Sequence, residues 1–204
     1  MLPFPDRHEL ARRLPRLFLG LVEFGLGLAL MVASGLGLPP WEVLHQGISR
    51  HVPIPLGTVG IITGLLVLLL WIPLRERVGV GTLLNAVLIG VAIDLTLLWL
   101  RQPEAMVLRW GFLVAGLLLI GSGSGFYIGA GMGPGPRDGL MTGLARRGVS
   151  VGVVRTFIEV TVLAAGWLLG GTVGVGTVLF SLGVGPVVQF FLVRLSMEPL
   201  PEAA

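Results

Sequence analysis

The sequence predicts an all-α membrane protein whose six transmembrane helices form two inverted repeats of three. Three observations support this prediction. The 204 residues are 54% hydrophobic and only 12% charged, with a mean hydropathy of +0.92, which is too apolar for a soluble domain of this length. Six apolar runs approach the length of about 20 residues that a hydrocarbon core of ~30 Å requires. A pattern rich in glycine and proline also recurs after 96 residues.

The six spans follow one another with short linkers. We expect them at 17–37, 54–74, 79–100, 110–132, 151–169 and 173–193. They form one membrane domain, 17–196, between an Arg-rich cytoplasmic tail at 1–16 and a C-terminal tail at 197–204. The first run follows positive residues, as in a signal peptide. It is too long for the apolar region of such a peptide and carries Glu23, so we expect it to be retained.

Arginine placement predicts the orientation. All 14 basic residues are arginine. If the N-terminus is cytoplasmic, the outer loops hold only Arg50, Arg101 and Arg109, and the other loop and tail arginines lie inside. This bias is the positive-inside pattern, so we expect both termini in the cytoplasm.

The duplication is centred on a broken helix. In GLGLPPWEVLHQG (35–47) and GMGPGPRDGLMTG (131–143), a long apolar run ends in Gly-x-Gly, a proline restarts the chain, and an acidic residue follows. Glycine permits the break, and proline suits the first turn of a helix. The residues that define the two breaks are Gly35, Gly37 and Pro40, and Gly131, Gly133 and Pro136.

A second block supports the duplication. VGVGT at 78–82 recurs at 173–177, after 95 residues. We therefore divide the domain into repeat one, 17–101, and repeat two, 110–196. Each repeat holds three spans, and because three is odd, the second repeat enters the membrane from the opposite side.

The helices after the breaks are too short to span. Pro40–Ser49 and Pro136–Ala145 would each be ~15 Å long, so they are either half-helices dipping into the membrane or amphipathic helices on its surface. In transporters built from inverted repeats, such breaks mark the substrate site, and half-helix N-termini attract anions. The candidate solute-binding residues are Trp41, Glu42, Arg137 and Asp138. A purely structural turn, with Trp41 as an interfacial anchor, is the alternative.

Small residues four apart form a stripe on the first and fourth spans. The stripes are Gly121, Gly125, Gly129 and Gly133, and Gly25, Ala29, Ala33 and Gly37. Such stripes allow another helix to pack closely, so we predict that these two spans cross. Packing against another neighbour, or a homodimer contact, would use the same spacing.

Ionisable side chains inside the spans are costly and mark candidate functional positions. The ionisable residues are Glu23, Asp94, Arg155 and Glu159. Gln189, the polar counterpart of Asp94 in the second repeat, is added to this set. Glu23 has no obvious partner in its own span and is the candidate for proton coupling. Arg155 and Glu159 are four residues apart, which favours a mutually neutralising structural pair. Asp94 lies near the outer end of its span, where it could reach the interface.

Several function classes find no support in the sequence. There is no cysteine, and the three histidines lack a metal-ligand spacing. The arginines form no basic face interleaved with aromatic residues, so we expect no nucleic-acid partner. The glycine-rich stretch at 129–134 follows no strand and lacks the Lys-Ser/Thr of a phosphate-binding loop. We expect neither a metal nor a cofactor, and no enzyme activity.

The stretches 35–49 (GLGLPPWEVLHQGIS), 131–147 (GMGPGPRDGLMTGLARR) and LGVGPVVQFFL from Leu182 carry a family resemblance. They resemble the YczE-like bacterial membrane proteins of the YczE/YyaS/YitT group, over nearly all of residues 15–195. The resemblance implies a small polytopic protein of the bacterial inner membrane, in a group often described as transporters. It implies no particular functional residues.

The function we expect is a small secondary transporter or exporter of a small polar or anionic solute, bound between the two broken helices. One alternative is a substrate-binding membrane subunit that works with a separate ATPase module. The other is a membrane scaffold or accessory protein without transport activity. The expected partners are the lipid bilayer and an unidentified solute.

Overall fold

The computed structural model describes residues 7–197, and these fold into α-helices without a strand. Residues 1–6 of the expected N-terminal tail and 198–204 of the expected C-terminal tail lie outside the described residues. The helices are α1 (Arg7–Ser34), α2 (Pro40–Ser49), α3 (Leu56–Leu74), α4 (Val80–Leu97), α5 (Met106–Gly129), α6 (Pro136–Ala145), α7 (Val151–Leu168) and α8 (Val175–Leu195).

Six of these helices are long and apolar enough to cross a membrane, and they match the six predicted spans. The all-α membrane fold is therefore confirmed. The first helix begins at Arg7, earlier than the expected start at residue 17. Arginine and leucine are good helix formers, so the arginine-rich lead-in continues the helix, with Pro15 inside it.

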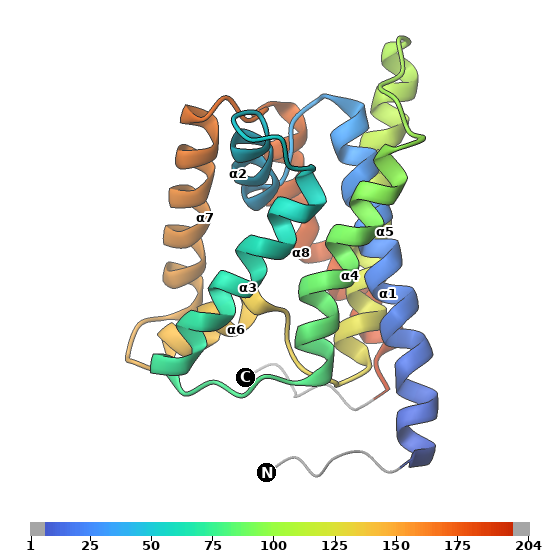
Figure 1. The fold of residues 1–204 in the computed structure, drawn as a ribbon. Coiled ribbons are helices and arrows are strands. Elements are labelled where there is room, and N and C mark those ends of the chain that lie inside the picture. Colours follow the sequence, from blue (N-terminus) through green and yellow to red (C-terminus); the bar gives the residue numbers. More distant parts are fainter. Residues whose placement is uncertain (1–6, 198–204) are drawn as a thin grey trace.

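Helices α1 and α5 run antiparallel in close contact (Figure 1). A Cβ atom added at Gly20 would lie 2.6 Å from the carbonyl oxygen of Gly123, and one at Gly27 would lie 2.6 Å from that of Gly116. Backbones can approach this closely only where side chains are missing. The predicted crossing of the first and fourth spans is therefore confirmed.

The prediction of which residues make that crossing was wrong. Gly121 and Gly125 face Val187 and Phe191 of α8, and Gly25 faces Ala92 of α4. Each of α1 and α5 carries small residues on two faces, and spacing alone does not say which neighbour each face meets.

Arginines from one half of the chain hold helix ends of the other half. Arg109 of α5 donates from Nε to the Ser34 carbonyl (2.6 Å) and from Nη2 to that of Gly35 (3.0 Å), at the C-terminus of α1. Arg13 of α1 donates to the Ala130 carbonyl (3.1 Å), at the C-terminus of α5. Cations suit these positions because the last carbonyls of a helix carry partial negative charge.

The two predicted helix breaks are present and have the same backbone geometry. Gly35 and Gly131 have φ of 62° and 64°, and Gly37 and Gly133 both have φ of 118°. Residues with a side chain rarely adopt these angles. Pro40 and Pro136 are the first residues of α2 and α6, as expected.

Each break is held by the last long helix of the other half. The Gly81 amide of α4 donates to the Met132 carbonyl (2.9 Å), and the Gly176 amide of α8 donates to the Leu36 carbonyl (2.8 Å). The short helices α2 and α6 lie toward opposite ends of the bundle (Figure 1), and their first turns are joined by an ion pair from Arg137 to Glu42. Both therefore behave as half-helices that dip into the bundle, rather than as surface helices.

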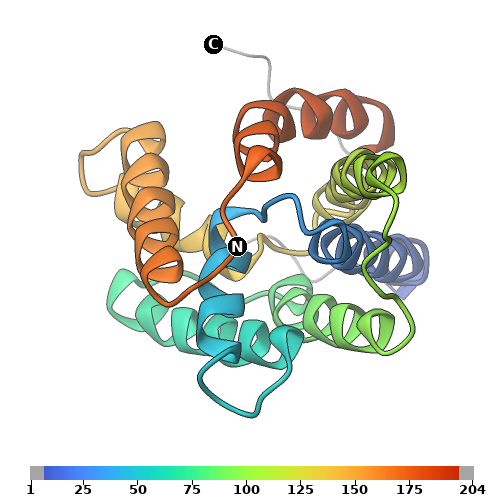
Figure 2. The same cartoon turned by 90° about the horizontal axis from the view of Figure 1, so that it is seen from above.

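The two halves differ in how their last two long helices pack. Helices α3 and α4 are in contact, and a Cβ atom at Gly57 would lie 2.0 Å from the Gly90 carbonyl oxygen. Helices α7 and α8 stand apart when the bundle is seen from above (Figure 2). Their glycines at the equivalent positions, Gly152 and Gly185, have nothing within 4 Å of an added Cβ atom. The second half is therefore open where the first half is closed.

Candidate functional site

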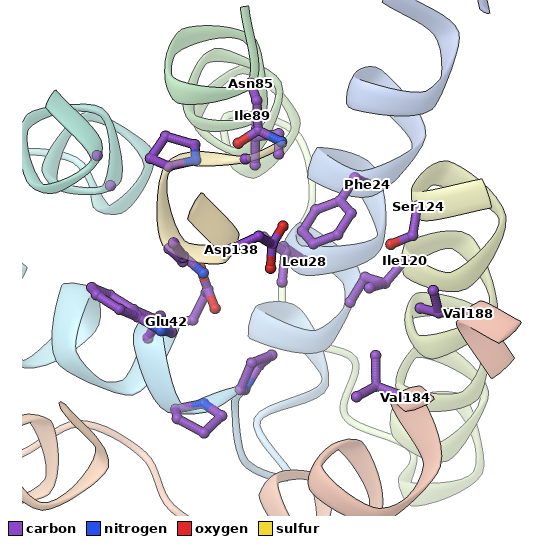
Figure 3. A pocket seen from close by; sticks show the side chains of 18 of the residues that line it. Phe24, Leu28, Glu42, Asn85, Ile89, Ile120, Ser124, Asp138, Val184 and Val188 are labelled. Atoms are coloured by element: carbon purple, nitrogen blue, oxygen red, sulfur yellow. The ribbon is translucent and has the colours of Figure 1, made fainter. Parts of the chain in front are cut away.

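A cavity of about 330 Å³ lies between the first turns of α2 and α6, and every helix contributes to its wall (Figure 3). This volume is at the lower end of the range for small-molecule sites. The break residues Pro40 and Pro136 line it, whereas the four break glycines do not. The four predicted solute-binding residues all line it: Trp41, Glu42, Arg137 and Asp138.

An ion pair joins the two half-helices at the cavity. Arg137 Nη2 lies 2.9 Å from Glu42 Oε1, and the Glu42 side chain is only 2% exposed. The Arg137 guanidinium also lies over the Trp41 ring, 4.9 Å from its centroid. Glu42 stands in the first turn of α2, where the partial positive charge of the helix N-terminus favours a carboxylate. Arg137 is thus already neutralised and is not a free anion-binding group.

Asp138 has a different environment from its sequence counterpart Glu42. It accepts a hydrogen bond from the Tyr127 hydroxyl (Tyr127 Oη to Asp138 Oδ2, 3.0 Å), and it is exposed to the cavity (Figure 3). Within residues 7–197 no arginine lies within ion-pair distance of Asp138. It is the one cavity carboxylate in that range without a cationic partner.

Two buried ring nitrogens at the cavity wall have no hydrogen-bond partner among the described residues. They are Trp41 Nε1 and His45 Nε2, on side chains that are almost fully buried. His45 Nδ1 lies 3.6 Å from Glu42 Oε1. A Cβ atom at Gly60 of α3 would lie 3.3 Å from the same nitrogen, so glycine leaves room for the imidazole. An unpaired buried polar atom typically costs about 1–3 kcal/mol.

Sequence reasoning missed His45 and Tyr127. His45 could have been found from its place three residues after Glu42, on the same face of a short helix. Its counterpart in the second repeat, Met141, is apolar, so the repeat gave no signal. Tyr127 is the chain's single tyrosine and lies inside an apolar span, which was the available signal.

The predicted pair of Arg155 and Glu159 forms, with Nε and Oε1 2.9 Å apart on α7. Both residues line the cavity, as does Gln189 of α8. The polar residues predicted on the last two spans are therefore brought to the cavity wall.

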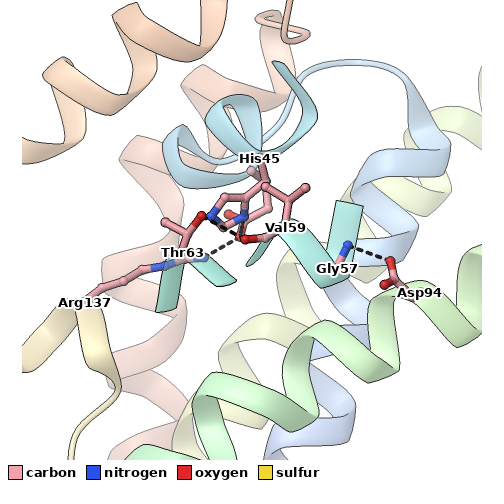
Figure 4. Close-up of polar contacts among 7 residues, drawn as sticks. His45, Gly57, Val59, Thr63, Asp94 and Arg137 are labelled. Atoms are coloured by element: carbon pink, nitrogen blue, oxygen red, sulfur yellow. Dashed lines mark hydrogen bonds and ion pairs between the residues drawn. The ribbon is translucent and has the colours of Figure 1, made fainter. Parts of the chain in front are cut away.

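Asp94 and Glu23 do not line the cavity. Asp94 caps α3, accepting a hydrogen bond from the amide of Gly57 (2.6 Å), which Figure 4 shows. It also accepts from the amide and the hydroxyl of Thr58, both at 2.7 Å. Glu23 accepts a hydrogen bond from Ser122 of α5 (2.9 Å), a partner outside its own span.

No grouping of three histidine, aspartate or glutamate side chains in residues 7–197 could hold a metal ion. The described wall of the cavity combines apolar side chains, paired charges and a few unpaired polar atoms. Such a wall can bind a small polar molecule and shield it from lipid.

Comparison with known proteins supplies the family. Residues 11–193 match a family of unknown function, DUF6198. An uncharacterized protein of Haemophilus influenzae is 44% identical over 184 residues, covering 90% of this chain and 84% of the relative. The uncharacterized membrane protein YczE of Bacillus subtilis is 36% identical over 191 residues, covering 91% and 88%. YyaS of the same species is 26% identical over 184 residues, covering 85% and 89%.

No solved structure matches the chain. The resemblance to YczE-like proteins is confirmed by these relatives, one of which is described as a membrane protein. The chain belongs to the DUF6198 family of YczE-like membrane proteins.

Proposed function

We propose that the protein is a secondary carrier that moves a small polar solute through the cavity by alternating access. In this proposal the two halves are inverted repeats. The observation that carries it is the difference between the halves: α3 packs on α4, whereas α7 stands away from α8. One half is closed and the other open around a shared cavity, which is what a carrier caught in one of its two states requires.

Equivalent contacts on both sides of the fold support the inverted repeat. The arginines at positions 13 and 109 are 96 residues apart, and each caps the helix of the other half. The amides of Gly81 and Gly176 are 95 residues apart, and each holds the opposite break. Reciprocal contacts of this kind are expected around a pseudo-twofold axis lying in the membrane plane.

The proposed second state follows by exchanging the conformations of the halves. Gly152 would then pack on Gly185, as Gly57 packs on Gly90 here. Gln189 would approach the N-terminus of α7, as Asp94 caps that of α3. With the termini in the cytoplasm, as the arginine bias indicates, the gap between α7 and α8 opens the cavity inward. The exchange would open it outward.

A disulfide trap tests the exchange. The chain has no cysteine, so Glu159→Cys with Ser181→Cys adds the sole thiol pair. These positions are the counterparts of Gly64 and Ala86, where a Cβ atom at Gly64 would lie 3.6 Å from that of Ala86. We expect mild oxidation in membranes to cross-link this pair, because a disulfide needs Cβ atoms about 3.5–4.5 Å apart. The matched control joins Glu159→Cys with Val187→Cys, since Val187 faces Gly121 of α5 and should stay unlinked. If the first pair cross-links no faster than the control, the exchange does not occur.

Water access distinguishes a carrier from the other functions. Ser124→Cys places a thiol on the cavity wall (Figure 3), and Leu182→Cys places one on the outer, apolar surface of α8. A carrier should let membrane-impermeant thiol reagents reach Ser124→Cys from either side of the membrane and leave Leu182→Cys unlabelled. Labelling from one side alone would favour a substrate-binding subunit of an ATPase-driven system, and no labelling would favour a scaffold. Either result would overturn the carrier proposal.

A further inference from the structure

The charges that line the cavity do not balance. Each arginine already has a carboxylate partner at 2.9 Å: Arg137 pairs with Glu42, and Arg155 pairs with Glu159. The remaining acidic residue of the described wall is Asp138, whose hydrogen-bond partner is the neutral hydroxyl of Tyr127. With His45 neutral, the wall is therefore one positive charge short.

The internal repeat shows where that charge is missing. Glu42 and Asp138 are equivalent positions, and so are Arg137 and Trp41, which come one residue earlier. Arg137 reaches across to Glu42, so the symmetry-related contact would run from position 41 to Asp138. Position 41 is a tryptophan, which has no charge to offer. The acid of the second repeat is thus left without the guanidinium that the acid of the first repeat has.

Aromatic rings stand beside this unpaired carboxylate. Phe24 and Tyr127 form an edge-to-face pair with ring centroids 6.1 Å apart, and both line the cavity. Tyr127 holds the Asp138 carboxylate through its hydroxyl, and Figure 3 shows this carboxylate directed into the cavity that Phe24 lines. A carboxylate next to aromatic rings is a recognition pattern for ammonium and guanidinium groups, because ring faces and carboxylate both attract cations.

Two buried ring nitrogens beside the cavity are also unsatisfied. Trp41 and His45 line the cavity, are nine-tenths or more buried, and have Nε1 and Nε2 without partners among the described residues. Buried polar atoms are normally satisfied by protein, water or ligand. This wall therefore has hydrogen-bonding capacity that its own side chains do not use.

We propose that the cavity binds a small organic cation, an amine, quaternary ammonium or guanidinium compound, whose charged group contacts Asp138. The cation supplies the positive charge that position 41, the counterpart of Arg137, does not provide to Asp138. This solute class is opposite in charge to the anion expected from Arg137 alone. Arg137 does not attract an anion because it is already paired with Glu42. The inference rests on the proposed function in taking this cavity as the solute site.

A pair of probes of one shape isolates the charge. Choline and 3,3-dimethylbutan-1-ol differ in whether the branched end is a trimethylammonium or a neutral tert-butyl group, and methylguanidinium copies the head of arginine. We expect choline or methylguanidinium to raise the Tm of the purified protein, and the neutral alcohol and the anion isovalerate to leave it unchanged. Asp138→Asn should weaken cation binding by ~10-fold or more, because a charge-assisted contact is lost. Glu104→Gln, an exposed loop carboxylate, should leave it unchanged.

A second measurement needs no bound ligand. At Ser124→Cys, a trimethylammonium methanethiosulfonate reagent should react faster than the sulfonate analogue, since a carboxylate in a confined cleft concentrates cations. Adding Asp138→Asn should reduce this ratio several-fold, and adding Glu104→Gln should not. Because this readout uses folded protein, it decides the question even if Asp138→Asn lowers the Tm.

The outcomes separate the two proposals. Four outcomes would each overturn the cation site. Three concern the Tm: the neutral alcohol stabilises as much as the cations, isovalerate alone stabilises, or neither cation stabilises. The fourth is a reagent ratio that Asp138→Asn leaves unchanged. In those cases a Ser124→Cys thiol that reacts from both sides would leave the carrier intact. A thiol that never reacts would instead refute the carrier.

Discussion

Replacing Arg137 by glutamine should destabilise the protein far more than replacing Arg137 and Glu42 together. The two side chains meet at 2.9 Å, with Glu42 2% exposed and Arg137 31% exposed. At an effective dielectric constant of about 20, two unit charges at this distance attract by ~6 kcal/mol. Desolvation of both ions offsets most of that attraction. The pair therefore adds little net stability, although each member depends on the other.

The single changes have unequal costs because the two side chains differ in burial. Arg137→Gln leaves Glu42 charged and buried, which should cost about 3–5 kcal/mol. Glu42→Gln leaves Arg137, which is partly exposed and can recruit water, so we expect about 1–2 kcal/mol. The double variant has no buried charge and should lie within about 1 kcal/mol of the parent protein. The coupling energy should thus exceed ~2 kcal/mol.

The free energy of unfolding can be measured by titrating mixed micelles with a denaturing detergent and following far-ultraviolet circular dichroism. The bridge between Arg146 and Glu76 is the matched control. It has the same 2.9 Å separation, but Arg146 is 72% exposed, so its coupling energy should be below ~1 kcal/mol. If the changes at Arg137 and Glu42 add within ~0.5 kcal/mol, the half-helices are not joined by a buried ion pair.

Four further changes test the surrounding framework by the same unfolding measurement. Asp94→Ala should cost about 2–4 kcal/mol, because it removes three hydrogen bonds at the start of α3; a cost below ~0.5 kcal/mol would show that α3 does not need this cap. Gly139→Ala should cost at least ~2 kcal/mol, because its Cβ would lie 2.0 Å from the Trp71 ring, whereas Gly111→Ala, with nothing within 4 Å, should stabilise by up to ~1 kcal/mol. Arg109→Met should cost about 2–4 kcal/mol through two lost bonds to the end of α1; an unchanged free energy would mean that water satisfies those carbonyls equally well.

Much of the fold could be predicted because its signals are local. Apolar length indicates a span, and the Gly-x-Gly break followed by a proline predicts the geometry seen at Gly35, Gly37 and Pro40. The repeat of that pattern also brought the right residues to one cavity, since Glu42 and Arg137 were both predicted there.

The rest depended on which helices are neighbours, and a single sequence does not state that. Asp94 caps α3 because α3 begins beside it, and no residue near Asp94 in the sequence indicates this contact. Gly121 meets α8 rather than α1 because two faces of α5 carry small residues. The separation of α7 from α8 could not be predicted, because Gly152 and Gly185 match Gly57 and Gly90 in the sequence although only the second pair is in contact.

The reciprocal arginine caps also bear on biogenesis. During synthesis, α1 leaves the ribosome with its last carbonyls unsatisfied, because Arg109 lies 75 residues beyond Ser34 in the chain. At about 5–20 residues per second, that partner appears some ~4–15 s later. The break after α1 lacks the Gly176 amide for even longer, because Gly176 is synthesised after Arg109. The nascent first half therefore has unsatisfied polar backbone groups while it is held in the insertion machinery or in lipid. A chain truncated after α4 would keep these groups unsatisfied, and we expect proteases to degrade it.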